Sequence, residues 1–322
     1  MTRAAVLEAV SGAEAMPLPK GLRVLSVHQL LAMSIPPREM LLEPILQKQG
    51  LLMLHFKRGV GKTHVVLGIA YALASGGSFL RWKAARPTRV LIVDGEMPLS
   101  ALQERLAAVV AAGAQEPPAP DYLQLVASDY QPNGLPDLAT PEGQAALEPL
   151  LTAGGGVEVL ILDNLSTLCR SGKENEGEGW LPVQEWALSL RRRGISVVFV
   201  HHAGKGGAQR GTSRREDVLD TVIALRHAET YSPDQGAVFE VHLEKARAVH
   251  GEPAKPFEAK LEVREGAAVW TTRDLTDSQY AAVVALLQDR LSVRDTAEEL
   301  GIGKSTVSRM RQRAIAEGLI DA

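Results

Sequence analysis

Runs of apolar, β-type residues alternate with helical stretches through the middle of the chain, and this alternation restricts the fold more than any other feature. The runs are LLMLHF (51–56), RVLIVD (89–94), VEVLILD (157–163), ISVVFVHH (195–202) and TVIAL (221–225). Between the first four lie THVVLGIAYALAS, PLSALQERLAAVVAAG and LPVQEWALSLRRRG, each with an apolar stripe at helical spacing. Continuous apolar strands separated by such helices predict an α/β fold: a twisted, mostly parallel sheet with helices on both faces.

The flanking segments complete the predicted domain organisation. AVFEVHLEKARAV (237–249) and FEAKLEVREGAAVWTT (257–272) alternate or break at a Gly turn, which predicts antiparallel edge strands. Upstream, SVHQLLAMSIPPREMLLEPIL has apolar residues at helical spacing, broken by Pro36 and Pro37. After residue 274 the pattern is purely helical. We therefore expect a flexible tail (1–22), an α/β domain with an N-terminal linker helix (23–270) and a small all-α domain (275–322).

Composition limits the partners and the location. The net charge is −3, so any contact with nucleic acid has to come from local basic patches. A single cysteine, Cys169, excludes an internal disulfide framework. The N-terminus lacks the pattern of a signal peptide, and no apolar run approaches the length of a membrane span. We expect a protein of the cytoplasm with no membrane contact.

The string FKRGVGKT, between the first strand and its helix, predicts a phosphate-binding loop. Backbone N–H groups at a helix N-terminus converge on phosphate oxygens, a lysine reaches the β- and γ-phosphates, and a Ser/Thr hydroxyl ligates Mg²⁺. The expected ATP-binding residues are Arg58, Gly59, Val60, Gly61, Lys62, Thr63 and His64. Phe56 stands where the first glycine of such loops is found, five positions before Gly61. We expect an altered start of the loop, with the Phe56 side chain pointing back into the sheet, rather than loss of binding.

A second string, GIGKST (301–306), has a similar sequence but the wrong surroundings. No strand precedes it, Glu298 stands where its first glycine belongs, and it lies between two short helices. We predict that it binds no nucleotide.

Polar residues follow three further strands, where parallel sheets bind ligands. Asp163 ends a buried strand and could hold the water shell of Mg²⁺ together with Thr63, although turn and helix-cap aspartates are also common there. Asp94 and Glu96 end another strand, where one carboxylate could activate a water molecule; Glu96 could instead be a first-turn residue of the next helix. His201 and His202 end a third strand, and we expect one of them to contact the γ-phosphate and the other to be structural.

The order of these motifs resembles that of RecA-fold ATPases, notably the plasmid RepA and DnaB-like hexameric helicase group. The motifs are RGVGKT, GEMPLSALQERL, LILDNLS, VHHAGKGGAQRGTS and LEKARAVHG, within residues 25 to 265. The resemblance implies that Lys62 and Thr63 hold phosphate and Mg²⁺, that Glu96 is the catalytic base and that Asp163 is the Walker B acid. It also implies that His202 senses the γ-phosphate and that Arg105 helps to organise the site.

The same resemblance implies assembly. Lys245 and Arg247 match residues that such helicases insert into a neighbouring subunit's site, where a cation stabilises the transferring phosphoryl group. Arg210 is the competing candidate, and all three could be solvated surface charges. The implied assembly is a ring or filament, with a hexamer expected. Phe56 and the short GKGGAQRG loop depart from the pattern, so helicase activity is less firmly implied than ATPase activity.

The C-terminal segment predicts a helix-turn-helix. Ala297 is small enough for two helices to approach, Gly301 permits the turn and Val307 packs the second helix inward. In the predicted recognition helix, KSTVSRMRQRAIAEG, Ser305 or Thr306 would contact bases or phosphates. Lys304, Arg309, Arg311 and Arg313 supply the positive face. The alternative is a helical module for protein–protein assembly.

These features favour an ATP-hydrolysing, DNA-associated motor in plasmid, phage or mobile-element replication, acting on single- or double-stranded DNA. A DNA-binding regulator or helicase loader with ATP as an assembly switch is the main alternative. A RecA-like recombinase has no distinct strand-exchange features here, and a dinucleotide-binding oxidoreductase is disfavoured by GKT followed by the Asp163 strand.

Overall fold

The computed structural model describes residues 23–56, 61–171, 180–202, 217–228, 231–247 and 249–320, and these residues divide into two units between Arg38 and Glu39. The expected tail, residues 1–22, lies outside the described residues. In the first unit, the short helix α2 (Val27–Ala32) begins at Ser26, whose side chain and that of Gln29 form a capping box. No residue of α2 is buried, and Leu30 and Leu31 are exposed.

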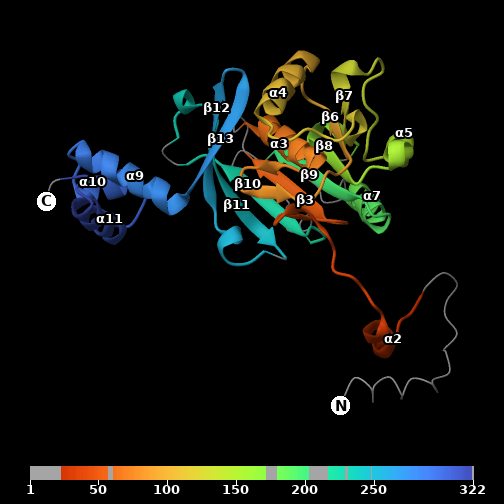
Figure 1. Ribbon diagram of the computed structural model, residues 1–322, viewed down its shortest axis with the longest axis horizontal. Helices are drawn as coiled ribbons and strands as arrows, with labels where there is room; N and C mark the ends of the chain where they lie inside the picture. The colour runs from red at the N-terminus through yellow and green to blue at the C-terminus, as the bar shows by residue number, and fades with distance from the viewer. Residues whose placement is uncertain are drawn as a thin grey trace. The chain divides into compact units, whose positions relative to one another are not determined.

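The second unit is built on a nine-stranded sheet in the order β13-β12-β11-β10-β3-β9-β8-β6-β7 (Figure 1). The six strands from β10 to β7 are parallel, and β11, β12 and β13 continue the sheet antiparallel. The strands are β3 (Leu51–Phe56), β6 (Val90–Asp94), β7 (Leu123–Ala127), β8 (Val159–Asp163), β9 (Ser196–His202), β10 (Thr221–Arg226), β11 (Val238–Ala246), β12 (Phe257–Arg264) and β13 (Ala267–Asp274). The expected α/β class, with antiparallel edge strands, is confirmed.

Helices cover both faces of this sheet. On one face, α3 (Lys62–Ser75) and α4 (Leu99–Ala112) pack with Leu52, Leu54 and Phe56 of β3 in one core. On the other, α5 (Pro141–Thr152), α6 (Leu165–Leu168) and α7 (Leu181–Arg192) pack with Leu51 and Met53 in a second core. Successive residues of a strand point to opposite faces, so a strand with helices on both faces has to be apolar throughout.

Residues 40–47 differ from the helical spacing read in the sequence. They form strands β1 (Met40–Glu43) and β2 (Leu46–Gln47), which join β4 (Ser78–Phe79) and β5 (Trp82–Ala84) in a separate sheet ordered β2-β1-β5-β4. Leu41, Leu42, Ile45 and Leu46 are all buried in the core that contains α3. Burial in that core outweighs the weak local preference for a helix. Strand β7 and helix α5 also had no counterpart among the elements predicted from the sequence.

Strand β13 ends at Asp274, and helix α9 (Leu275–Gln288) begins at the next residue. Helices α10 (Val293–Glu299) and α11 (Lys304–Ala316) follow, and Val283, Ala297 and Val307 form a small buried core between the three helices. Gly301 lies in the turn between α10 and α11 with a φ of 60°, a conformation that favours glycine. The expected helix-turn-helix is confirmed; the GIG of GIGKST lies in its turn, and Lys304, Ser305 and Thr306 begin α11. Among the described residues, no helix is long and apolar enough to cross a membrane.

Candidate active site

The sheet brings the sequence motifs to one edge. Asp94 of β6 is paired with Asp163 of β8, and Phe56 of β3 with His202 of β9. In the order β3-β9-β8-β6, all four strands end together at their carboxyl ends. This is the edge at which parallel α/β sheets bind ligands.

Helix α3 begins at this edge and presents its N-terminus to it. Gly61 is the N-cap in a left-handed conformation (φ 94°) and, as a glycine, has no side chain with which to cap the first turn. The backbone N–H groups that point out of the first turn of a helix, together with the helix dipole, favour an anion at this position. Arg58, Gly59 and Val60 lie outside the described residues. Phe56 is 1% exposed, and its ring meets the His202 ring edge-on, so its side chain points into the sheet as expected.

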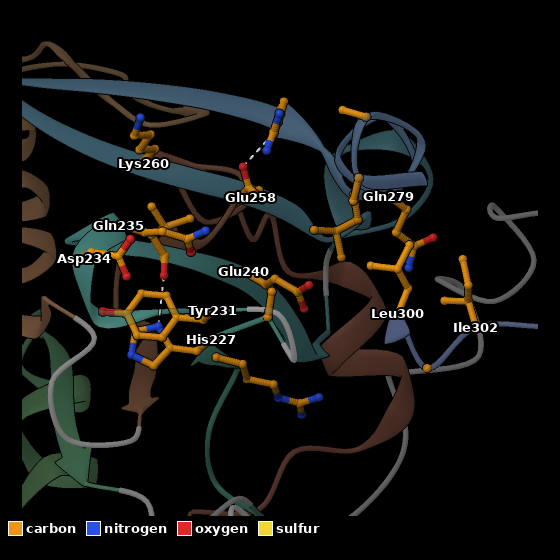
Figure 2. Close-up of a pocket in the computed structure, with 18 residues that line it drawn as sticks. His227, Tyr231, Asp234, Gln235, Glu240, Glu258, Lys260, Gln279, Leu300 and Ile302 are labelled. Atoms are coloured by element: carbon orange, nitrogen blue, oxygen red, sulfur yellow. Dashed lines mark hydrogen bonds and ion pairs between the residues drawn. The ribbon is translucent and has the colours of Figure 1, made fainter. Parts of the chain in front are cut away.

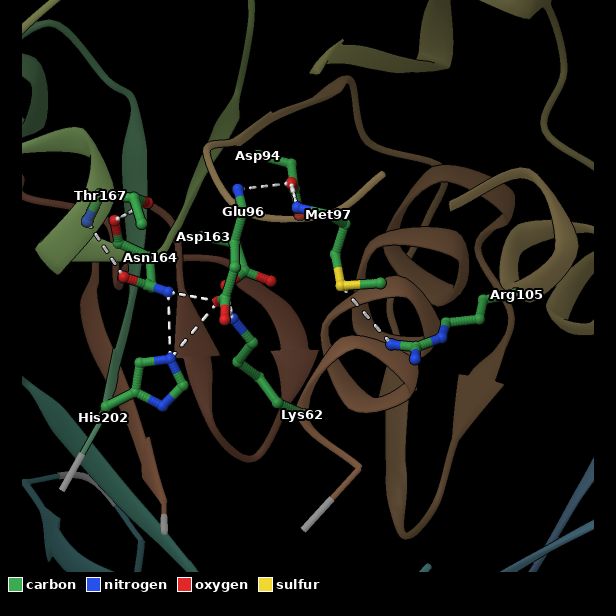
Figure 3. A network of polar contacts seen from close by, with 9 residues as sticks. All are labelled: Lys62, Asp94, Glu96, Met97, Arg105, Asp163, Asn164, Thr167 and His202. Carbon is green, nitrogen blue, oxygen red and sulfur yellow. Dashed lines mark hydrogen bonds and ion pairs between the residues drawn. The ribbon is translucent and has the colours of Figure 1, made fainter. Parts of the chain in front are cut away.

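Lys62 lies at the centre of the polar cluster shown in Figure 3. Its Nζ donates a hydrogen bond to Asp163 Oδ1 at 2.8 Å and also pairs with the Glu96 carboxylate. Burial lowers the pKa of the Lys62 ammonium, but Asp163 and Glu96 together raise it above its usual value. The lysine is therefore held as a cation beside two carboxylates.

Asp163 is deeply buried, and burial raises its pKa to about 6 even though Lys62 opposes the shift. Its second oxygen, Oδ2, is also buried and has no hydrogen-bond partner among the described residues. A carboxylate oxygen of this kind is suited to hold Mg²⁺, directly or through the ion's water shell. Thr63, buried in the first turn of α3, supplies a hydroxyl. This donor set fits an ion that is bound mainly by water and phosphate oxygens.

Glu96 is held in place from several directions. Asp94 Oδ1 accepts hydrogen bonds from the backbone N–H groups of Glu96 (3.0 Å) and Met97 (2.7 Å), which shapes the turn after β6. The Glu96 carboxylate accepts a hydrogen bond from Asn164 Nδ2 at 2.6 Å and lies 3.4 Å from His202 Nε2. Partial burial would raise the pKa of Glu96, but Lys62 and His202 lower it below its usual value. Glu96 is therefore ionised at neutral pH. Asp94, by contrast, accepts hydrogen bonds from the backbone of the turn that carries Glu96.

Asn164 is the site residue that the sequence patterns did not reveal. It is 1% exposed, its Nδ2 lies 3.1 Å from His202 Nε2, and its Oδ1 accepts the N–H of Thr167 to cap α6. It thus bridges Glu96 and His202 from a fixed position. An asparagine directly after the strand-end aspartate in LILDNLS was the available signal, but it reads equally well as an ordinary helix cap.

Some expected residues lie outside this cluster. The Arg105 guanidinium, on α4, contacts the Met97 sulfur at 3.8 Å, and Figure 3 shows it well away from Lys62. His64 follows in α3; burial and the nearby Arg105 charge lower its pKa. Arg210 lies outside the described residues.

Lys245 and Arg247 lie near the opposite edge of the sheet. Ala246 of β11 pairs with Thr221 of β10, and Thr221 pairs with Leu52 of β3. Ala246 therefore lies at the same height in the sheet as Leu52, four residues before the end of β3. At about 3.3 Å per residue this is about 13 Å from the P-loop edge. Arg247 there donates a hydrogen bond to the Asp217 carbonyl at 2.7 Å.

The predicted DNA-binding residues lie on α11. Lys304, Ser305 and Arg309 are exposed, and Thr306 and Arg311 are half-buried. Arg313 is engaged within the helical domain: its Nε donates to Glu317 at 2.8 Å and its guanidinium lies over the Tyr280 ring. It is therefore the least available of the expected DNA contacts.

Comparison with known proteins adds two family matches. The AAA domain family matches residues 15–208, more than half of the chain, and the homeodomain-like domain family matches residues 279–322. No curated protein matches the chain. Among solved structures, the KaiC-like protein PH0186 from Pyrococcus horikoshii OT3 is similar at 14% identity and a TM-score of 0.49. That similarity covers 73% of this chain and 99% of the other.

The first match contains Gly61, Lys62, Glu96, Asp163 and His202, and the second contains α10 and α11. The chain belongs to the AAA domain family and carries a C-terminal homeodomain-like helix-turn-helix.

Proposed function

We propose that the protein hydrolyses ATP at the edge formed by β3, β9, β8 and β6, and that it does so as a DNA-associated assembly. The observation that carries this proposal is the cluster in which Lys62, at the N-terminus of α3, lies between Asp163 and Glu96. The family match supports ATPase activity independently.

Each residue of the cluster would have a separate role in phosphoryl transfer. Lys62 would bind the β- and γ-phosphates, exchanging its carboxylate partners for phosphate oxygens. Thr63 and Asp163 would hold Mg²⁺, which when bound would neutralise negative charge on the phosphates. Glu96 would accept a proton from the water molecule that attacks the γ-phosphorus, with ADP as the leaving group. Asn164 and His202 hold the Glu96 carboxylate in place, and His202 is also positioned to contact the γ-phosphate.

The position of Lys245 and Arg247 supports assembly. Along the strand direction, Lys245 lies about 10 Å and Ala246, which precedes Arg247, about 13 Å from the P-loop edge, and β11 is two strands away from β3, so both cations lie away from the γ-phosphate of their own site. If either one stabilises the transferring phosphoryl group, it does so in the site of another copy. This supports a ring or filament, with a hexamer as the expected form.

The decisive test of the site is Lys62→Ala, which should abolish ATP turnover and weaken binding of a fluorescent ATP analogue. Lys83→Ala, at an exposed position of β5, is the matched control and should turn over ATP at the wild-type rate. Turnover by Lys62→Ala at the wild-type rate would refute this assignment of the site.

A second candidate is a DNA-binding regulator or helicase loader that uses ATP as a switch with little turnover. The helix-turn-helix favours it, because the exposed Lys304, Ser305 and Arg309 would suit duplex DNA. ATP turnover with and without single-stranded DNA separates the two candidates. Strong stimulation indicates a motor for plasmid, phage or mobile-element DNA, whereas slow turnover with nucleotide-dependent duplex binding indicates a switch.

A further inference from the structure

The face of the sheet turned away from α3 carries charged side chains on its antiparallel strands. Glu240 of β11 and Glu258 and Lys260 of β12 line a cavity of about 870 Å³, which the turn at residues 300–302 also lines (Figure 2). Phe239, next to Glu240 in β11, lies in the core that contains α3. Since neighbouring residues of a strand point to opposite faces, the charged side chains lie on the face away from α3.

His55 points to this same face from β3. It is the last residue but one of the strand, and Met53, two residues earlier, lies in the core on the side opposite to α3. The His55 side chain reaches across β10 to β11, where its Nε2 lies 2.6 Å from Glu244 Oε2. Ala224 of β10 is paired with His55, and its small methyl group leaves room for a contact that spans two strand spacings, together about 10 Å. A residue next to the phosphate-binding loop thus holds β11.

Glu244 is held from two sides. Its other carboxylate oxygen pairs with the guanidinium of Arg226, the last residue of β10. Partial burial would raise the pKa of Glu244, but the contacts with His55 and Arg226 lower it below its usual value. Glu244 is therefore an ionised acceptor, to which groups of β3 and β10 donate.

Glu244 is also the extra residue of a β-bulge. Ile223 of β10 pairs with Leu243, and the preceding residue of β10, Val222, pairs with Lys245, so Glu244 is inserted between two paired residues of β11. Such an insertion shifts the register by one residue, and a shift of one residue moves the side chains that follow to the other face of the sheet.

The bulge decides which face of the sheet Lys245 and Arg247 occupy. At residues 239, 241 and 243 the apolar side chains of β11 pack on the side of α3, and unbroken alternation would place the two cations there too. Lys245 instead pairs with Val222, whose side chain lies in the core on the opposite side. Arg247, two residues further along, follows Lys245. Both cations therefore project from the face on which Glu244 is held.

We propose that Glu244 is a positioning residue for ATP hydrolysis in the neighbouring subunit: held by His55 and Arg226, it fixes the bulge that presents Lys245 and Arg247 to that subunit's site. The proposal rests on the assembly proposed above, in which these cations enter the site of another copy. It also accounts for His55, a side chain that is only 5% exposed and yet polar, in a strand of otherwise apolar residues.

The first test measures turnover by Glu244→Ala alone. We expect kcat to fall by about 10- to 100-fold, because a displacement of about 1 Å in a catalytic group is enough for such a loss. KM and the binding of a fluorescent ATP analogue should stay at their wild-type values, because the variant's own Lys62 cluster is intact. Retained binding also shows that the variant folds. Glu244→Gln, which keeps an oxygen toward His55, should lose less activity.

Glu240→Ala is the matched control. Glu240 lies on the same strand and the same face, pairs with His242 at 2.7 Å, and has a side chain that is 26% exposed, against 29% for Glu244. It precedes the bulge, so Glu240→Ala should turn over ATP at the wild-type rate. A loss equal to that of Glu244→Ala would mean that any charge removed from this face is harmful, and the role given to the bulge would be wrong.

The second test identifies the subunit whose site is damaged, by mixing two variants. Lys62→Ala has an inactive site but supplies correctly placed cations, whereas Glu244→Ala has an intact site but supplies displaced cations. At a head-to-tail interface, the first variant can complete the site of the second. About a quarter of the interfaces in a random equal mixture have this arrangement, so turnover should rise about fivefold or more above the sum of the two variants measured alone.

His55→Ala removes the same contact from the other side. It should lower kcat by a similar factor, and mixing with Lys62→Ala should restore turnover in the same way. The double variant His55→Ala/Glu244→Ala should be no slower than the slower single variant, because residues that act through one contact are not additive. Losses that multiply would show that the two residues act separately, against the proposal.

A mixture of Arg247→Ala with Lys62→Ala separates this proposal from the function on which it rests. If that mixture gains no activity, the cations do not act between subunits, and the proposed assembly is wrong together with the role of Glu244. If it gains activity but the mixture of Glu244→Ala with Lys62→Ala does not, the assembly stands and Glu244 acts only within its own subunit, which overturns the proposal. Wild-type kcat in Glu244→Ala would overturn it as well.

Discussion

Replacing Asp163 with asparagine should destroy ATP hydrolysis and yet stabilise the fold at neutral and alkaline pH. Burial raises the pKa of this carboxyl from its usual 3.8 to about 6. Since the folded state binds the proton more tightly than the unfolded chain, the folded state is favoured while Asp163 is protonated. That stability is fully present below pH 3.8 and is lost as the pH rises through about 6.

The size of the effect follows from the two pKa values. Ionising the buried carboxyl reduces the free energy of unfolding by about 2 kcal/mol at pH 5 and by about 3 kcal/mol at pH 8. The asparagine side chain is neutral at every pH and nearly isosteric with the protonated acid. The difference in unfolding free energy between Asp163→Asn and wild type should therefore grow by about 1 kcal/mol from pH 5 to pH 8.

Urea denaturation of both proteins at pH 5, 6.5 and 8, without nucleotide, measures this difference. Asp137→Asn is the control, because the pKa of Asp137 is shifted in the opposite direction to that of Asp163. Despite partial burial, hydrogen bonds from Ser171, Ala139 and Arg170 lower the pKa of Asp137, so that this residue is ionised in both states throughout the range. The effect of Asp137→Asn should not change between pH 5 and pH 8. If the advantage of Asp163→Asn stays constant or shrinks as the pH rises, the folded state favours the carboxylate and our reasoning about its burial is wrong.

Three further outcomes follow from the site and the helix-turn-helix. Asn164→Ala should lower kcat by about 10- to 100-fold with little change in KM for ATP, because it releases Glu96 without touching the P-loop; steady-state kinetics would show this, and an equal rise in KM would contradict it. Arg247→Ala should leave ATP-analogue binding intact but lower turnover by about 10³-fold, and should inhibit mixed assemblies with wild type. An unchanged rate of turnover would instead favour Arg210 as the cation that enters the neighbouring subunit's site. Arg309→Ala should reduce the slope of log Kd against log salt for duplex DNA by about one, whereas Gln312→Ala, exposed on the same helix, should leave it unchanged.

The sequence by itself determined the parallel sheet and the order of its motifs. Apolar runs such as VLILD and VVFVHH have no polar face to expose, so they had to become strands covered on both sides. Once the strands are parallel, residues at their carboxyl ends meet at one edge, and the grouping of Lys62, Glu96, Asp163 and His202 follows. Local rules also sufficed for the helix-turn-helix, whose small core of Ala297 and Val307 depends on spacing within one short segment.

Only the tertiary structure decided the features that depend on partners distant in the sequence. Residues 40–47 read as helical but pair with β5, because Leu41 and Leu42 gain more from burial in the main core than from local propensity. Asn164 reads as a helix cap, and its contact with Glu96, 68 residues away, exists only because β6 and β8 are neighbours in the sheet.

The same holds for electrostatics and for the cavity. Burial raises the pKa of Asp163 to about 6, and that burial is a property of the assembled sheet and its helices, which no local string encodes. GIGKST could be recognised from its surroundings as a turn rather than a P-loop. That Gly301 and Ile302 line a cavity together with residues of β11 and β12 required the folded chain, since strand order and the path of α9 place them there.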